Sequence, residues 1–199
     1  MIEERKELIE KIKKQYGENY ILGLLPDKVA RKFIGYCSMN HDLEMVENYI
    51  AEIEKGIESE TIYSSLTYSS IILYSKCFAD SSKANFPKLE ANNVYRDNDN
   101  LLEFHEYLMQ LRHKFLAHRN ITSAEVGVAF FAFPKTLERN QLKYKHFKFA
   151  GFSNEGINQF KINNSHLQKF LKKKIQKVSN KLFESVMQKD KNWAPEKLN

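Results

Sequence analysis

The stretch "NLLEFHEYLMQLRHKFLAHRN", residues 100–120, decides the fold that this sequence predicts. Its large apolar side chains recur at the spacing of a single helical face. They are Leu101, Phe104, Leu108, Leu111 and Phe115. The second half of the stretch, residues 111–120, adds two Arg, two His and one Lys to the same helix. Because an unpaired charge beside a buried stripe costs free energy, we expect an anionic group to face this cluster.

Signals for the two ends of this helix flank the apolar stripe. Asn100 and Glu103 have the spacing of a capping box in which the Asn is the N-cap. Asn120 fits a left-handed stop just beyond the last helical turn, which we place near Ala117. The sequence therefore predicts one amphipathic helix from about residue 100 to residue 117.

Two residues of the cluster, Arg112 and His118, border the apolar stripe. They are separated by about 9 Å of rise and about 120° of rotation, so they are too far apart to act on one atom unless the helix ends between them or a second copy contributes. A two-fold pairing of this helix would place two Arg and two His around a shared cleft, with the apolar stripe as the dimer contact. The alternative is structural. An acid such as Glu58, Asp97 or Glu103 would pair with Arg112, and the helix dipole would favour His118.

The rest of the chain predicts further helices around this one. We expect them at residues 2–16, 27–36, about 40–55, about 58–78 and about 164–188. Asn40 or Asp42 is the expected cap of the third helix, and Asn164 or Ser165 is the expected cap of the last. Residues 81–97, with a Pro and several Asn and Asp, have the composition of a loop.

Two β-like segments lie between the amphipathic helix and the last helix. Residues 125–133 and 143–149 are rich in aromatic and β-branched side chains, which favours two strands that pair as a hairpin. The hairpin insertion spans about residues 124–152. The predicted fold class is therefore mainly α, a helical bundle with one β-hairpin insertion. A length of 199 residues suits a single domain, 1–199.

The charge of the chain is uneven and its cysteines are few. The net charge of +6 combines an acidic first half, 1–100, with a basic second half, 101–199. A basic half of this size favours a polyanion such as nucleic acid as partner. Cys37 and Cys77 lack C-x-x-C spacing, which argues against a disulfide framework and a zinc site. The start does not resemble a signal peptide and no apolar run is long enough to span a bilayer, so we expect a cytoplasmic protein.

At residues 112–118 the sequence "RHKFLAH" resembles the motif of the HEPN superfamily, in which an Arg is followed by a polar residue, a short spacer and a His. The wider segment "LRHKFLAHRN" is especially similar to abortive-infection and toxin-type members. A helix rich in small residues before the motif and a long final helix after it extend the resemblance over about residues 40–190. The resemblance implies a HEPN-like helical bundle that forms a homodimer through its motif helices.

The same resemblance implies a metal-independent endoribonuclease that acts as a toxin or phage-defence effector and needs no cofactor. Carried onto this chain, His118 is the general acid and base for attack of an RNA 2′-hydroxyl on its own phosphate. Arg112 stabilises the charge on the phosphoryl oxygens. His113 orients groups within the site. The expected RNA contacts beside them are Lys114, Arg119 and Asn120.

The expected partners are RNA, a second copy of the chain and an antitoxin protein. Some toxin members carry a Tyr at the position of Asn120, where a nucleotidyltransferase antitoxin modifies it, so we do not expect control by that route. In the second strand, "KYKHFKF" interleaves basic and aromatic residues, and Lys143 and Lys145 are further candidate RNA contacts. The alternative there is an edge strand whose lysines prevent aggregation. The alternative function is a non-catalytic HEPN protein that binds RNA, a nucleotide or a partner protein through the same cleft.

Overall fold

The computed structural model describes residues 2–20, 27–81, 85–117, 123–132 and 141–189. These residues form six α-helices, one π-helical turn and a two-stranded antiparallel sheet. In chain order the elements are α1 (Ile2–Tyr16), α2 (Asp27–Glu54), α3 (Glu60–Lys76), α4 (Ala91–Val94), α5 (Asp99–Gln110), the π-helix η2 (Leu111–Leu116), β1 (Glu125–Ala132), β2 (Gln141–Lys148) and α6 (Asn154–Lys189). The mainly α class, with a hairpin before the long final helix, is confirmed.

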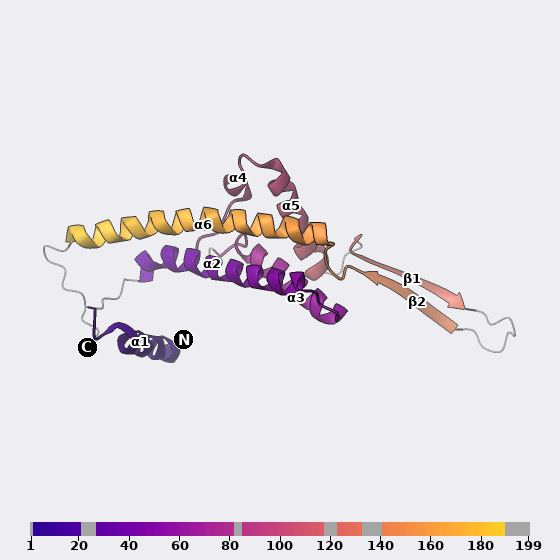
Figure 1. The fold of residues 1–199 in the computed structure, drawn as a ribbon, viewed down its shortest axis with the longest axis horizontal. Helices are drawn as coiled ribbons and strands as arrows, with labels where there is room; N and C mark the ends of the chain where they lie inside the picture. The colour runs from indigo at the N-terminus through magenta and orange to yellow at the C-terminus, as the bar shows by residue number, and fades with distance from the viewer. Residues whose placement is uncertain (1, 21–26, 82–84, 118–122, 133–140, 190–199) are drawn as a thin grey trace.

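The two longest helices, α2 and α6, lie side by side and form the spine of the bundle (Figure 1). Helix α3 packs against α2, and α5 contacts both α3 and α6. Among the described residues, the hydrophobic core is drawn from α2, α3, α5, η2, α6 and the segments that join them, with no residue from α1. Its largest fully buried side chains are Tyr74, Tyr95 and Phe160. The core includes Leu111 and Phe115 of the motif stretch.

Helix α2 is one continuous helix where the sequence predicts two, at 27–36 and 40–55. The predicted cap, Asn40, instead lies within the helix, and its side-chain amide donates to Glu44 one turn later over 2.7 Å. The carboxylate of the other predicted cap, Asp42, forms an ion pair with the ammonium of Lys76 on α3, at 2.7 Å. Asn40 bonds within α2 and Asp42 bonds to α3, so neither side chain caps a helix and α2 continues past both.

Helix α6 begins at Asn154, ten residues before the predicted start. The hydroxyl of Ser153 accepts from the amide of Gly156 at 3.3 Å, which gives the helix its first-turn cap. Asn164, the predicted cap, is buried and its side chain donates to the carbonyl of Leu43 on α2 over 3.0 Å. An Asn that resembles a cap in the sequence is therefore part of the interface between α2 and α6.

The stretch before the motif also differs from its prediction. Asn98, not Asn100, caps α5, and its side chain accepts from the amide of Leu101 at 3.2 Å. Within 81–97, predicted as a loop, the described residues include the short helix α4 and three buried side chains. These are Leu89, Val94 and Tyr95. Tertiary packing orders this segment, although its polar composition is typical of a loop.

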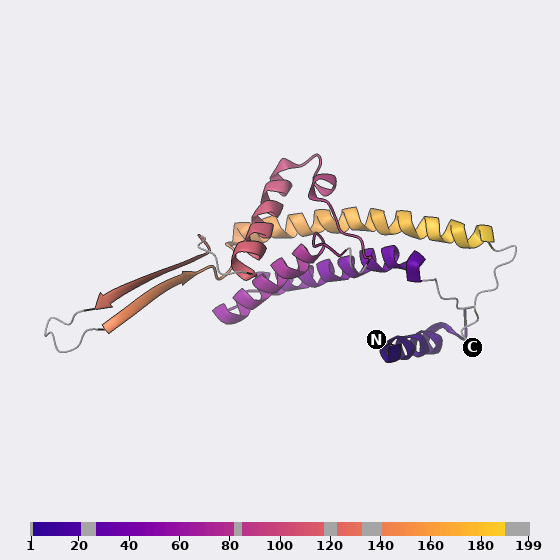
Figure 2. The same ribbon diagram turned by 180° about the vertical axis from the view of Figure 1, so that it is seen from behind.

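The hairpin predicted between the motif helix and the final helix is confirmed. Strands β1 and β2 pair in antiparallel register, with Glu125 opposite Lys148 at the base and Ala132 opposite Gln141 at the far end. The hairpin projects from one end of the bundle as an arm, and both views of the ribbon show it clear of the helices (Figures 1 and 2). We refer to β1 and β2 together as the arm.

Candidate functional site

The motif stretch is not an α-helix throughout, because the last turn after α5 is a π-helix. The amide of Ala117 donates to the carbonyl of Arg112 over 3.0 Å, five residues earlier. π-helical turns are rare in proteins and occur frequently at functional sites. From Leu111 to Leu116 the chain therefore turns less per residue than the ideal helix assumed from the sequence. The predicted angle between Arg112 and His118 is not tested, because His118 lies outside the described residues.

Arg112 is half-buried on this π-turn and contacts the next side chain. One terminal guanidinium nitrogen, Nη1, lies 2.9 Å from Nδ1 of His113. Because Arg has only donors, His113 must accept this hydrogen bond through an unprotonated Nδ1. No carboxylate in the described part of the chain pairs with Arg112, so the predicted structural partners Glu58, Asp97 and Glu103 are not used. The guanidinium keeps most of its N–H groups for another acceptor.

The apolar stripe of this helix is buried within the chain itself. Leu108, Leu111 and Phe115 are each less than a tenth exposed and belong to the hydrophobic core. The ring of Phe115 packs edge-on against Tyr68 of α3 and against Phe149 at the base of the arm. The prediction that this stripe forms the contact between two copies is therefore wrong, because the chain's own elements already cover it.

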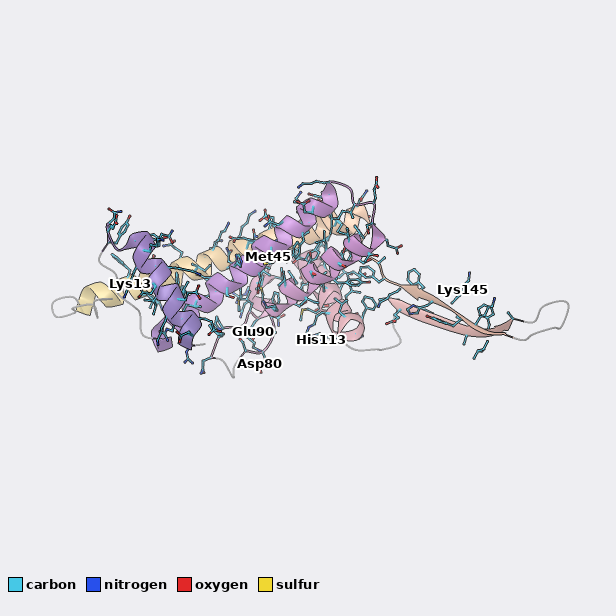
Figure 3. The ribbon with its side chains drawn as sticks, turned by 90° about the horizontal axis from the view of Figure 1, so that it is seen from below. Lys13, Met45, Asp80, Glu90, His113 and Lys145 are labelled. Atoms are coloured by element: carbon cyan, nitrogen blue, oxygen red, sulfur yellow. The ribbon has the colours of Figure 1, made fainter. Side chains whose placement is uncertain are left out.

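The structure brings three of the predicted site residues together on the π-turn. Arg112 is half-buried, whereas His113 and Lys114 are exposed. Figure 3 labels His113 at the end of the bundle next to the arm. The predicted catalytic His118 and the predicted RNA contacts Arg119 and Asn120 lie outside the described residues. The remaining candidates, Lys143 and Lys145, lie out along the arm and not beside Arg112.

One cation that lies beside the π-turn is not predicted from the sequence. The ammonium of Lys148, at the end of β2, lies 5.5 Å from the centre of the Phe115 ring, within range of a cation–π interaction. Phe149, the next residue, anchors this end of the arm, because its amide donates to Ala124 over 2.7 Å and its carbonyl accepts from the Tyr68 hydroxyl. The only signal in the sequence is the alternation of "KYKHFKF", which does not say which lysine faces the motif.

A buried polar network lies behind the motif helix. The Tyr74 hydroxyl is 2.6 Å from the Tyr95 hydroxyl, 3.0 Å from Nδ1 of His105 and 3.0 Å from the side-chain oxygen of Asn163. The Asn163 amide donates to the carbonyl of Leu101 on α5 over 2.8 Å. Burial lowers the pKa of His105 to about 4, so this imidazole is neutral near pH 7. His105 belongs to the core and does not border an open cleft.

Two grooves on the described surface differ sharply in charge. One, of about 600 Å³, lies between α5 and the start of α6 and is acidic and aromatic. Its lining includes Glu103, Phe104, Tyr107 and Glu155. The other, of about 440 Å³, lies between α2 and the distant half of α6 and is basic. Its lining includes Lys32, Tyr36, Lys174, Lys177 and Lys181.

Comparisons with known proteins add no relative to this picture: no protein-family model, no curated protein and no solved structure matches the chain. Within the described residues, no three His, Cys, Asp or Glu side chains gather as metal ligands. No described helix is long and apolar enough to cross a membrane. Cys77 is buried, and burial raises the pKa of its thiol to about 12. The π-turn and the groups around it are therefore the candidate functional site.

Proposed function

We propose that this protein is a metal-independent endoribonuclease of the HEPN type, acting in the cytoplasm as a toxin or phage-defence effector. The observation that carries the proposal is the Arg112 guanidinium, which no described carboxylate neutralises and which His113 holds on a π-turn. A guanidinium of this kind offers paired donors to a phosphate, and the planar fork matches phosphate oxygens. Lys114 on the same turn adds a second positive charge to the exposed surface.

In this mechanism the motif supplies all the chemistry without a metal. The imidazole of His118 removes the proton from an RNA 2′-hydroxyl, and the 2′-oxygen forms a bond to the adjacent phosphorus. Arg112 stabilises the extra negative charge on the phosphoryl oxygens. The bond from phosphorus to the 5′-oxygen breaks, and that oxygen takes a proton from the imidazolium of a second motif. The products are a 2′,3′-cyclic phosphate and a free 5′-hydroxyl.

A homodimer would supply the second motif, because the mechanism uses two imidazoles and each chain carries one motif. Arg119 and Asn120 are the proposed RNA contacts next to His118, and Lys148 is added to them because it lies against the π-turn. Lys143 and Lys145 are not required for the chemistry in this proposal, because they lie out on the arm.

The test is cleavage of RNA by the purified protein in EDTA, with the ends of the products identified. We expect 2′,3′-cyclic phosphates, and we expect Arg112→Ala and His118→Ala each to reduce the rate by about a thousandfold. Lys177→Ala, an exposed change on the distant half of α6, is the matched control for loss of one positive charge. Circular dichroism establishes that each variant is folded. Full cleavage by both motif variants would contradict the assignment.

The second candidate is a protein that binds RNA, a nucleotide or a partner protein through the same residues without cleaving RNA. It is favoured by the grouping of Arg112, Lys114 and Lys148 around one turn, because these cations bind phosphate without any general base. Binding of a short RNA with no product at any pH from 5 to 9, weakened by Arg112→Ala, would select this candidate over the first.

A further inference from the structure

The arm exposes apolar side chains on both of its faces. Leu142 is 70% exposed and Tyr144 is 74% exposed on one face, and Phe147 is 63% exposed on the other. Val126 and Val128 of β1 are also exposed. A two-stranded hairpin is marginally stable by itself in water, and contiguous exposed apolar surface marks an interaction site. The arm therefore has the character of an interaction surface.

Two lysines of β2, Lys143 and Lys145, share one face of the arm. The register places Lys143 opposite Phe130 and Lys145 opposite Val128, so both lysines share a face with apolar neighbours. Neither lysine pairs with a carboxylate of the described chain. Glu125 at the base is paired with His146, at 3.0 Å. The exposed part of the arm thus presents lysines and apolar groups to whatever covers it.

The groove between α5 and the start of α6 has the complementary character. Phe104 and Tyr107 supply aromatic surface, and Tyr107 is among the exposed large hydrophobic side chains. Glu103 and Glu155 line the same groove, and neither forms an ion pair with a described residue. The groove is adjacent to the motif, because Tyr107 precedes Arg112 by five residues, or about 7.5 Å along the helix.

We propose that the arm of one copy binds the groove of a second copy of this chain. The arm points away from the bundle that carries its own groove, so the two surfaces of one chain do not meet (Figures 1 and 2). The lysines of the arm would face the carboxylates of the groove, and the aliphatic side chains of the arm would face its aromatic rings. The two surfaces therefore match in charge and in polarity. Two such contacts related by a two-fold axis close a dimer, and each arm then lies beside the partner's π-turn.

RNA is the other class of molecule that could cover the arm, and it fits the observations less well. Phosphates would pair with Lys143 and Lys145, and the exposed rings of Tyr144 and Phe147 would stack on bases, but RNA would leave the aliphatic Val126, Val128 and Leu142 without an apolar partner. RNA would also leave the acidic groove unexplained. This inference rests on the homodimer of the proposed function. Its test measures the mass of the protein in solution and not the cleavage of RNA.

The experiment exchanges the charges of the two surfaces. One variant carries Lys143→Glu with Lys145→Glu, and the other carries Glu103→Lys with Glu155→Lys. We expect the wild type to have a mass near twice the 23.4 kDa of one chain. We expect each variant alone to dissociate about a hundredfold more readily, because like charges would face each other. Mixed in equal amounts, the two variants should restore the dimer, since every arm then meets a groove of opposite charge.

Controls separate the arm from general charge effects and from the proposed activity. Lys172→Glu with Lys173→Glu changes the same net charge on α6 and should remain dimeric. Arg112→Ala should also remain dimeric even though it is expected to lose cleavage. Three results would overturn the inference: a monomeric wild type, arm and groove variants as dimeric as wild type, or variants that do not complement each other. Loss of RNA binding in a fully dimeric arm variant would assign the arm to RNA instead.

Discussion

The guanidinium of Arg112 and the imidazole of His113 are joined by a hydrogen bond of 2.9 Å between side chains that follow each other in sequence. Adjacent residues on an α-helix point about 100° apart, so such a pair does not normally share one site. Here the π-turn begins at the preceding residue and places both side chains at the same end of the bundle. We propose that through this contact His113 positions Arg112 in the proposed site.

Replacing His113 tests this positioning role. We expect His113→Ala to lower the single-turnover cleavage rate about tenfold, because one hydrogen bond that orients the guanidinium is lost. His113→Asn retains a side-chain oxygen that accepts, and it should recover part of the rate. Gln110→Ala, an exposed change one position before the π-turn, is the control. If His113→Ala cleaves RNA at the wild-type rate, His113 does not orient Arg112.

Removing the hydroxyl of Tyr74 should destabilise the fold. Tyr74→Phe leaves the buried groups of Tyr95, His105 and Asn163 without a shared partner, and we expect the free energy of unfolding to fall by about 3 kcal/mol. Urea denaturation followed by circular dichroism measures the change. Tyr144→Phe removes a hydroxyl that is exposed on the arm and should change stability by less than about 0.5 kcal/mol. Equal effects of the two changes would argue against the network.

The buried imidazole of His105 should make stability depend on pH. Its pKa is about 4 in the folded protein against an ordinary value of 6.5, so the unfolded chain binds the proton more readily. Stability is then complete above about pH 6.5, falls as the pH drops toward 4, and has lost about 3 kcal/mol there.

Urea unfolding at pH 7 and pH 4 measures this dependence. The loss of stability on acidification should be smaller in His105→Gln than in the wild type. His41→Gln, a change at an exposed histidine, should behave as the wild type does. An unchanged pH dependence in His105→Gln would show that another group is responsible.

A methyl group at Gly151 should disturb the base of the arm. The added Cβ would meet the ring of Tyr63, whose hydroxyl donates to the carbonyl of Phe152. We expect Gly151→Ala to lower the free energy of unfolding by about 1–3 kcal/mol, as overpacking does elsewhere. Gly127→Ala is the matched control within the arm, because its Cβ would come no closer than 3.7 Å to the His146 ring. A neutral Gly151→Ala would mean that Tyr63 moves freely.

Local patterns predicted most of the elements and failed at particular polar residues. Four residues of the predicted stripe, Leu101, Leu108, Leu111 and Phe115, are buried, and Phe104 is partly buried. The strands pair as their composition predicts. The failures are the predicted caps Asn40, Asn100 and Asn164. Asn40 bonds within α2, Asn98 caps α5 in place of Asn100, and Asn164 bonds across to α2. An Asn has the same local preference for a cap in each place, and only the neighbouring helix decides what it binds.

The candidate site likewise depends partly on local sequence and partly on tertiary packing. The grouping of Arg112, His113 and Lys114 follows from their positions in the chain, whereas the π-turn that carries them and the approach of Lys148 depend on packing against the arm. No local spacing predicts a π-helix, because its hydrogen bonds are less favourable than those of an α-helix and persist only where tertiary contacts require them.

The sequence by itself determined that an amphipathic helix carries the cationic cluster, because side-chain spacing is a local property of the backbone. Only the tertiary structure decided what covers the apolar side of that helix. Tyr68 and Phe149 of the same chain pack against Phe115, where the sequence predicts contact with a second copy. Burial depends on which distant segments meet. The same packing leaves the arm and the groove of Glu103 and Tyr107 exposed, and it is there that we place the second copy.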